Sequence, residues 1–366
     1  MARFLRSIAL FVLALGLIGV IGMGALFVFS GGQPVDFVQK AFIRLSLSSR
    51  QDELSRAISS DTTPVRFTVN PGDTPPVIAR SLVDQGLIAD AGLFVDYVRL
   101  YDFDRQLQAG TYFLSRALTI PDIAAALTDA RSTQFAFRIL EGWRMEEIAA
   151  AIDDSPYFPF SGADFLAAVG PGAAVDPVFA QQVGLPPGSS LEGFLYPDTY
   201  QLPAEVTPGW LRDFLTETFM ERVGPQIPVD ATAQGFNLYQ IVTLAAIVER
   251  EAIHADEQPL IAGVYRNRLV AGMRLEADPT VQYPLGAPGS WWPRITAADY
   301  SGVFSPYNTY LNDGLPPGPI ASPGITAIQA VVYPATSDYY YFRADCRSDG
   351  YHDFARTFQE HLANGC

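Results

Sequence analysis

The chain has 366 residues, 49% of them hydrophobic, so it is long enough for two globular domains and has the composition of a folded protein. It carries 24 Lys and Arg against 39 Asp and Glu, a formal net charge of −15. Nucleic-acid binding needs clustered basic residues, so this balance argues against a nucleic-acid partner. The sequence contains no glycine-rich phosphate loop, and its three histidines are scattered. We therefore expect neither a cofactor nor a metal site.

Residues 8–29 form an apolar run without any charge. As a helix, about 22 residues span roughly 33 Å, enough for the hydrocarbon core of a bilayer. Arg3 and Arg6 precede the run, and positive charge favours the cytoplasmic side. We predict a cytoplasmic tail (1–6) and a transmembrane helix (7–30), with all later residues outside the cytoplasm. A cleaved signal peptide is the alternative, but its apolar core is usually shorter and no A-x-A cleavage site stands out.

Two segments follow before the central part of the chain. We interpret residues 31–64 as a polar stalk or linker with a helical centre. Within residues 65–131 the pattern predicts a strand, two helices and a second strand, and Thr119 is placed to cap a further helix. This order resembles a LysM-like glycan-binding module. The alternative is a packing domain that holds the rest of the chain away from the membrane.

The stretch from Asn237 to Ile253 has the strongest helical pattern of the chain. Asn237 is a good N-cap, and Gln240 stands three residues later, where its partner in a capping box belongs. Apolar residues then recur at helical spacing, and neither Gly nor Pro interrupts them. We predict one amphipathic helix with its apolar stripe against a core.

Glu249 lies just off that apolar stripe, near the end of the predicted helix. Its neighbours three and four residues away are apolar and mostly small, which leaves room for a ligand and raises the pKa of a carboxyl group. A carboxyl that stays protonated near neutrality can act as a general acid. The alternative is a solvated surface glutamate. Glu251 is two residues further on, so it points about 200° around the helix.

Other segments contain carboxylates and aromatic residues that could assist such an acid. Glu192 and Asp198 are candidates for a second carboxylate, although an Asp before Thr-Tyr could equally cap a turn. Asp278 is expected to organise the turn in which it stands. The proline-rich stretch 305–324 resembles a binding wall rather than a spacer. Our candidate sugar contacts, through amide groups and stacking aromatic rings, are Gln282, Tyr283, Tyr307 and Asn308.

Five ordered motifs cover nearly all of the chain after the apolar run: LEGFLYPDTY at 191–200, AAIVEREA at 245–252, VYRNRLVAGMRLEADPTVQY at 264–283, SPYNTYLNDGLPPGPIASPG at 305–324 and YYYFRADC at 339–346. Together they resemble the YceG-like endolytic murein transglycosylases of bacteria. The resemblance implies that the first Glu of the IVExE segment, here Glu249, is catalytic. Glu251, the second Glu of that segment, is a candidate supporting residue. It also implies a catalytic domain over residues 132–366. The expected fold is α+β, with the anchor and the LysM-like module before a mixed α/β domain.

The resemblance implies cleavage of the β-1,4 bond between N-acetylmuramic acid and N-acetylglucosamine within glycan strands, leaving 1,6-anhydro ends. Such an enzyme would be held in the bacterial inner membrane with its catalytic domain outside the cytoplasm. Its partners would be peptidoglycan strands and peptidoglycan synthases, and its action would end strand elongation. Two alternatives remain: a muramidase that uses water with Glu192 or Asp198, and a non-enzymatic glycan-binding scaffold.

The chain contains two cysteines, Cys346 and Cys366. Disulfides form in oxidising compartments, so placement of this region outside the cytoplasm favours a bond between them. Two unrelated thiols are the alternative.

Overall fold

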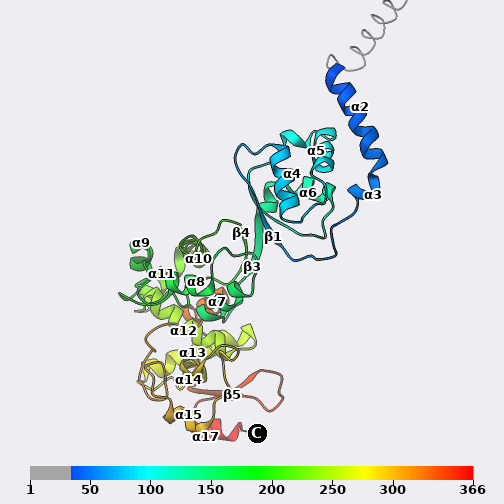
Figure 1. Cartoon of the computed structure of the whole chain (residues 1–366). Coiled ribbons are helices and arrows are strands. Elements are labelled where there is room, and N and C mark those ends of the chain that lie inside the picture. Colours follow the sequence, from blue (N-terminus) through cyan, green and yellow to red (C-terminus); the bar gives the residue numbers. More distant parts are fainter. Residues whose placement is uncertain (1–33, 366) are drawn as a thin grey trace, which may run out of the picture. The chain divides into compact units, whose positions relative to one another are not determined.

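The structure, a computed structural model, describes residues 34–365 (Figure 1). The chain divides into two compact units, one ending at Gln134 and the other beginning at Phe135. The sequence places the corresponding boundary after residue 131. Helices alternate with three separate two-stranded sheets in the described part of the chain, which agrees with the expected α+β class.

The first unit contains a two-stranded antiparallel sheet that shares one hydrophobic core with the surrounding helices. Strands β1 and β2 pair antiparallel, with Phe67 opposite Tyr112, and both side chains are fully buried. Thr119 caps α6 through a capping box with Asp122, as its position predicts. The elements are α2 (Pro34–Ser49), α3 (Gln51–Leu54), β1 (Val65–Val69), α4 (Pro75–Asp84), α5 (Ala91–Leu100), η1 (Phe103–Arg105), β2 (Gly110–Leu114), α6 (Ile120–Ala126) and η2 (Ala130–Thr133).

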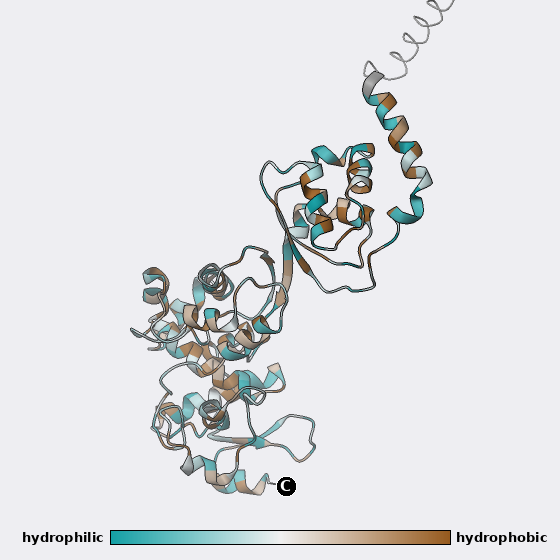
Figure 2. Ribbon diagram, in the orientation of Figure 1, coloured by the Kyte–Doolittle hydropathy of each residue, from teal (hydrophilic) through white to brown (hydrophobic). Residues whose placement is uncertain are grey.

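The predicted linker contributes to the first unit, because α2 packs against α5. Leu47 and Leu54, from α2 and α3, belong to the same hydrophobic core as the sheet. Hydrophilic and hydrophobic residues alternate along α2 (Figure 2).

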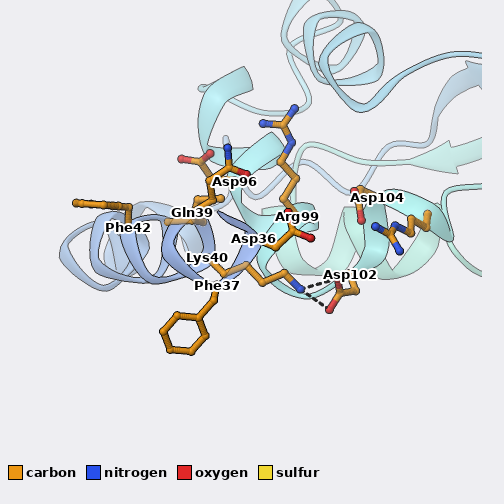
Figure 3. Close-up of a pocket in the computed structure, with 11 residues that line it drawn as sticks. Asp36, Phe37, Gln39, Lys40, Phe42, Asp96, Arg99, Asp102 and Asp104 are labelled. Carbon is orange, nitrogen blue, oxygen red and sulfur yellow. Dashed lines mark hydrogen bonds and ion pairs between the residues drawn. The ribbon is translucent and has the colours of Figure 1, made fainter. Parts of the chain in front are cut away.

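A cavity of about 660 Å³ lies beside α2 (Figure 3). Two of its lining residues, Lys40 and Asp102, form an ion pair of 2.6 Å.

The second unit is mainly helical. Strands β3 and β4 form its first sheet, and β5 and β6 form its second. Helix α12 packs against α13, α14 and α16, so it lies at the centre of this unit. The elements are β3 (Gln134–Arg138), α7 (Met145–Asp153), α8 (Gly162–Val169), α9 (Pro177–Val183), β4 (Thr199–Pro203), α10 (Pro208–Val223), α11 (Gln226–Ala233), α12 (Leu238–Glu251), η3 (Ala255–Glu257), α13 (Gln258–Val270), α14 (Asp278–Leu285), α15 (Ala297–Gly302), α16 (Ile325–Val332), β5 (Tyr341–Ala344), β6 (His352–Ala355) and α17 (Phe358–Ala363).

Helix α12 confirms the helix predicted for this stretch. The Asn237 side chain accepts from the Gln240 backbone N–H at 2.9 Å, and the Gln240 side chain accepts from the Asn237 N–H at 3.0 Å. All residues from Leu238 to Val248 except Gln240 are buried. The helix is therefore enclosed over most of its length, and only its last turn opens outward.

The sequence of residues 352–364, HDFARTFQEHLAN, predicts one final helix, and the structure differs from this prediction. Residues His352–Ala355 instead form β6, which pairs antiparallel with β5, and α17 begins only after Thr357. A cross-strand partner stabilises an extended segment that local propensity alone does not reveal. Cys346 is disulfide-bonded; the other cysteine of the sequence, Cys366, lies outside the described residues, so the predicted pairing stays a prediction.

No helix within residues 34–365 is both long enough and apolar enough to cross a membrane. The predicted transmembrane segment lies outside this range, and it stays a prediction.

Candidate active site

The last turn of α12 presents two carboxylates to different surroundings. Glu249 and Glu251 are two residues apart, so their side chains leave the helix about 200° from each other. Ala252, the C-cap, is extended, which ends the helix directly after Glu251. The two carboxyl groups can therefore be compared on one rigid element.

Glu251 opens into a cleft of about 500 Å³. Tyr265, from the neighbouring helix α13, donates its hydroxyl proton to Glu251 Oε1 at 2.7 Å. Burial is the main cause that raises the pKa of Glu251 to about 7, with the negative charge of Asp278 acting in the same direction, while the Tyr265 hydrogen bond and Arg268 oppose it. The carboxyl of Glu251 is thus substantially protonated near neutral pH.

A second carboxylate, Asp278, lines the same cleft. It is the first residue of α14, and its Oδ1 accepts from the Tyr310 hydroxyl at 2.6 Å. The Tyr310 ring stacks on Tyr300, with ring centres 4.2 Å apart and an angle of 15° between the planes. Stacked rings beside two carboxyl groups form a surface that suits the apolar face of a sugar.

The loop that supplies Tyr310 is fastened to α14 by threonine hydroxyls. Thr309 and Thr280 are both buried and lie 2.8 Å apart through their Oγ1 atoms. Thr309 Oγ1 also accepts from the Ala277 N–H at 3.0 Å. These bonds hold Tyr310 and Asp278 on one rigid wall of the cleft.

The sequence predicts Glu249 as the acid, but the structure places Glu251 rather than Glu249 among the residues that line this cleft. Glu249 Oε2 accepts from the backbone N–H of Gly324, the N-cap of α16, at 3.1 Å. Burial is the main cause that raises the pKa of Glu249 to about 6. A raised pKa therefore does not distinguish the two carboxyl groups; they differ in that Glu251 lines this cleft and Glu249 does not. The catalytic role predicted for Glu249 stays a prediction. Glu249 ties the loop before α16 to α12.

The other predicted carboxylates lie elsewhere. Glu192 is 1% exposed and accepts from the Met145 N–H, the first residue of α7, at 3.1 Å. Burial, followed by the charge of Glu146, raises the pKa of Glu192 to about 8. Asp198 accepts from Arg222 Nη2 at 2.5 Å and from the Thr199 N–H at 2.7 Å, which is the turn role that the sequence left open. Neither Glu192 nor Asp198 is among the residues that line the Glu251 cleft.

The four candidate sugar contacts also lie outside that lining. Tyr283 and Tyr307 pack together at 4.8 Å between ring centres, and the Tyr283 hydroxyl lies 3.4 Å from Glu192 Oε2. The Gln282 amide donates to the carbonyl of Pro293 at 2.9 Å. Asn308 is fully buried, and its amide donates to two backbone carbonyls of its own loop at 3.0 and 2.9 Å. This geometry gives Asn308 an organising role in the loop.

Sequence reasoning missed several residues of the cleft, including the two tyrosines that bond to its carboxyl groups. Tyr310 stands three residues after Tyr307 in the motif that was singled out, and Tyr265 begins the YRNR motif. Both were visible as aromatic residues, but their partners depend on how α13 and the loop pack against α12. His352 and His361 also line the cleft, but they stand far from Glu251 in the sequence, so sequence patterns do not reveal this proximity.

A carboxyl group with a pKa near 7, next to stacked aromatic rings in an open cleft, is suited to protonating the oxygen of a glycosidic bond. The fold and site thus define an enzyme class that cleaves glycans by carboxyl acid–base chemistry. The chain belongs to the YceG-like family, whose model matches residues 67–365.

Named proteins that are similar to this chain support its assignment to the family. A protein of Bacillus subtilis (strain 168) named endolytic murein transglycosylase is 31% identical over 319 residues, which cover 82% of this chain and 83% of the relative. A protein of the same name from Streptococcus pneumoniae serotype 2 is 26% identical, over 80% of this chain and 56% of the relative. The crystal structure of a yceG-like protein from Listeria monocytogenes matches with a TM-score of 0.56 and 30% identity, over 83% of this chain and 99% of that one.

Proposed function

We propose that the chain is an endolytic murein transglycosylase. It cleaves the β-1,4 bond between N-acetylmuramic acid and N-acetylglucosamine within glycan strands and leaves 1,6-anhydro ends. The observation that carries the proposal is Glu251, a half-buried carboxyl with a raised pKa in an aromatic cleft. The names of the relatives, which match most of this chain, support the same reaction.

Glu251 supplies both proton transfers of this reaction. Its protonated carboxyl first gives a proton to the glycosidic oxygen as the bond to C1 breaks. The C6 hydroxyl of the same muramyl residue then attacks C1, and the Glu251 carboxylate takes the hydroxyl proton, which restores the acid. Because the nucleophile belongs to the substrate, its effective concentration is high and no bound water has to be activated. One carboxyl group is sufficient.

The neighbours of Glu251 adjust its protonation and position. The Tyr265 hydroxyl holds one carboxyl oxygen, which leaves the other for the substrate. The negative charge of Asp278 favours the protonated form of Glu251 and would also stabilise the oxocarbenium-like charge that develops at C1. Burial and charge therefore act together to keep an acid available.

The test compares Glu251→Gln with Glu249→Gln in cleavage of purified glycan strands. Gln keeps the shape of the side chain but cannot transfer a proton, so we expect Glu251→Gln to lose on the order of a hundredfold or more in rate. Glu249→Gln should keep most activity, because its amide still fits beside the Gly324 N–H. Near wild-type cleavage by folded Glu251→Gln, or loss only in Glu249→Gln, would return the acid role to Glu249.

A muramidase is the second candidate, because Asp278 places another carboxyl in the same cleft. Water activated by Asp278 would attack C1 and leave a reducing end. Mass analysis of the product ends decides between the two: anhydro ends support the transglycosylase, and reducing ends support the muramidase. Absence of any cleavage by the purified full chain, with glycan binding retained, would favour a non-enzymatic scaffold.

We further propose that the enzyme is held in the inner membrane by residues 8–29, with the N-terminus inside and residues after 30 outside. The support is the uncharged run and the two arginines before it. An anchored, outward-facing enzyme meets glycan strands as peptidoglycan synthases extend them, so its cuts would end elongation. The LysM-like module would bind the same glycan.

A further inference from the structure

One wall of the Glu251 cleft is basic. Arg343 on β5, His352 on β6 and His361 on α17 all line it, and we call these three residues the basic wall. They come from the C-terminal hairpin and the helix after it, whereas Glu251 and Asp278 come from α12 and α14. The cleft thus has an acidic side, where the chemistry is proposed, and a basic side with no role in that chemistry.

Two of the basic side chains in this cleft, His352 and Arg268, already have carboxylate partners. His352 Nδ1 lies 2.9 Å from Glu257 Oε2, and both side chains are about nine-tenths buried. Arg268, which also lines the cleft, pairs with Glu276 at 3.1 Å and donates to the carbonyl of Leu275 at 2.8 Å. These contacts hold both side chains in place and leave them little capacity for a ligand.

Arg343 is different. Its Nε is buried and has no hydrogen-bond partner among the described residues, and its Nη1 makes only a long contact of 3.4 Å to the carbonyl of His361. Asp353 is its cross-strand partner in the register of β5 and β6. His361 Nδ1 is likewise buried without a partner in the described chain. Arg343 Nε and His361 Nδ1 are thus two buried polar atoms without a hydrogen-bond partner among the described residues. Such atoms indicate a ligand site.

We propose that Arg343 and His361 form a subsite for the acidic substituent of a muramyl residue in the glycan. This inference rests on the proposed function and names what selects the substrate. Each muramyl residue carries a lactyl group on C3, whose carboxyl is either free or extended by a peptide stem with carboxylates of its own. A guanidinium group binds a carboxylate through charge-assisted hydrogen bonds, while the neutral sugar rings lie along the tyrosines. N-acetylglucosamine has no such group, so the subsite sets the register of the strand relative to Glu251.

The test measures kcat and KM of the full chain on three substrates: strands without stems, the same strands with lactyl carboxyls converted to methylamides, and strands with stems. We expect Arg343→Gln to raise KM about tenfold or more on a carboxylate-bearing substrate, with kcat within about twofold. Arg343→Lys should recover part of the affinity. The larger effect on stemless strands would assign the lactyl carboxylate, and the larger effect on stem-bearing strands would assign the stem.

Arg347→Gln is the matched control, because Arg347 lies in the same hairpin but is 68% exposed and pairs with Asp345. It removes the same charge and should leave KM unchanged on all substrates. An equal rise in KM for Arg343→Gln on the methylamide strands, or no rise on any strand, would overturn the subsite.

Binding of the same strands to Glu251→Gln, followed by calorimetry, separates this inference from the proposed function. Loss of affinity on adding Arg343→Gln supports the subsite even if the wild-type chain cleaves nothing, in which case only the proposed reaction is wrong. Unchanged affinity overturns the subsite even if cleavage is normal.

Discussion

At the scale of single residues, burial alone does not identify the acid. Glu192, Glu249 and Glu251 all have pKa values raised mainly by burial. Glu192 is enclosed beneath α7 and Glu249 is bonded to the loop before α16, so only Glu251 combines a raised pKa with the cleft. The proposal of Glu251 as the acid therefore rests on geometry, because burial raises the pKa of all three groups.

The activity should fall as pH rises through about 7, because Glu251 must be protonated to act as an acid and its pKa is raised to about 7. A plot of kcat/KM against pH for the wild-type chain checks this. Tyr265→Phe removes a hydrogen bond that favours the ionised form, so it should move the alkaline limb to higher pH. An unmoved or lowered limb in folded Tyr265→Phe contradicts the assignment of that limb to Glu251.

The same shift has a consequence for stability. Because the folded state binds the Glu251 proton more tightly than the unfolded state, the contribution of Glu251 is most favourable below the unfolded pKa of about 4.3 and is lost as pH rises through about 7. Glu251→Gln cannot ionise, so its melting temperature should exceed that of wild type at pH 8. The difference should shrink towards pH 5. A constant difference across this range would contradict the linkage.

At the scale of elements, α12 is stabilised by a reciprocal capping box between Asn237 and Gln240. Asn237→Ala should lower the free energy of unfolding by about 1 kcal/mol, since it leaves the Gln240 N–H without its acceptor. Chemical denaturation of Asn237→Ala, Gln240→Ala and the double variant measures this. The double variant should lose less than the sum of the single losses, because each residue caps the other; strict additivity would contradict the box.

How far the sequence predicts an element depends on where its stabilising contacts lie. The cap and apolar stripe of α12 are local, so its bounds could be predicted closely. Strand β6 is held by β5, and a segment such as His352–Ala355 shows no strand signal without that partner. The same limit applies to the site: the motif containing Glu251 was found, but the choice between Glu249 and Glu251 depends on α13 and α14 packing around α12. Asn308 likewise carries the polarity of a ligand contact, and only tertiary structure reveals its buried bonds.

At the scale of the whole molecule, the compartment predicted from the N-terminal sequence has a chemical consequence at the other end of the chain. We predict a bond between Cys346 and Cys366, which lies outside the described residues. Closing a loop of this length stabilises a fold by about 3 kcal/mol on the chain-entropy model. Thiol labelling of the exported chain without reductant should find no free thiol, and reduction should lower its melting temperature. Two accessible thiols in the exported chain would contradict the bond.

The topology itself can be tested in spheroplasts that express the full chain. The arginines at positions 3 and 6 should hold the N-terminus in the cytoplasm, so protease added outside should degrade the residues after 30. Replacing both arginines with glutamate removes the charge bias and should leave part of the chain protected. A cytoplasmic protein serves as the control for intact membranes. Peptidoglycan lies outside the cytoplasm, so full protection of the wild-type chain would leave Glu251 without its proposed substrate.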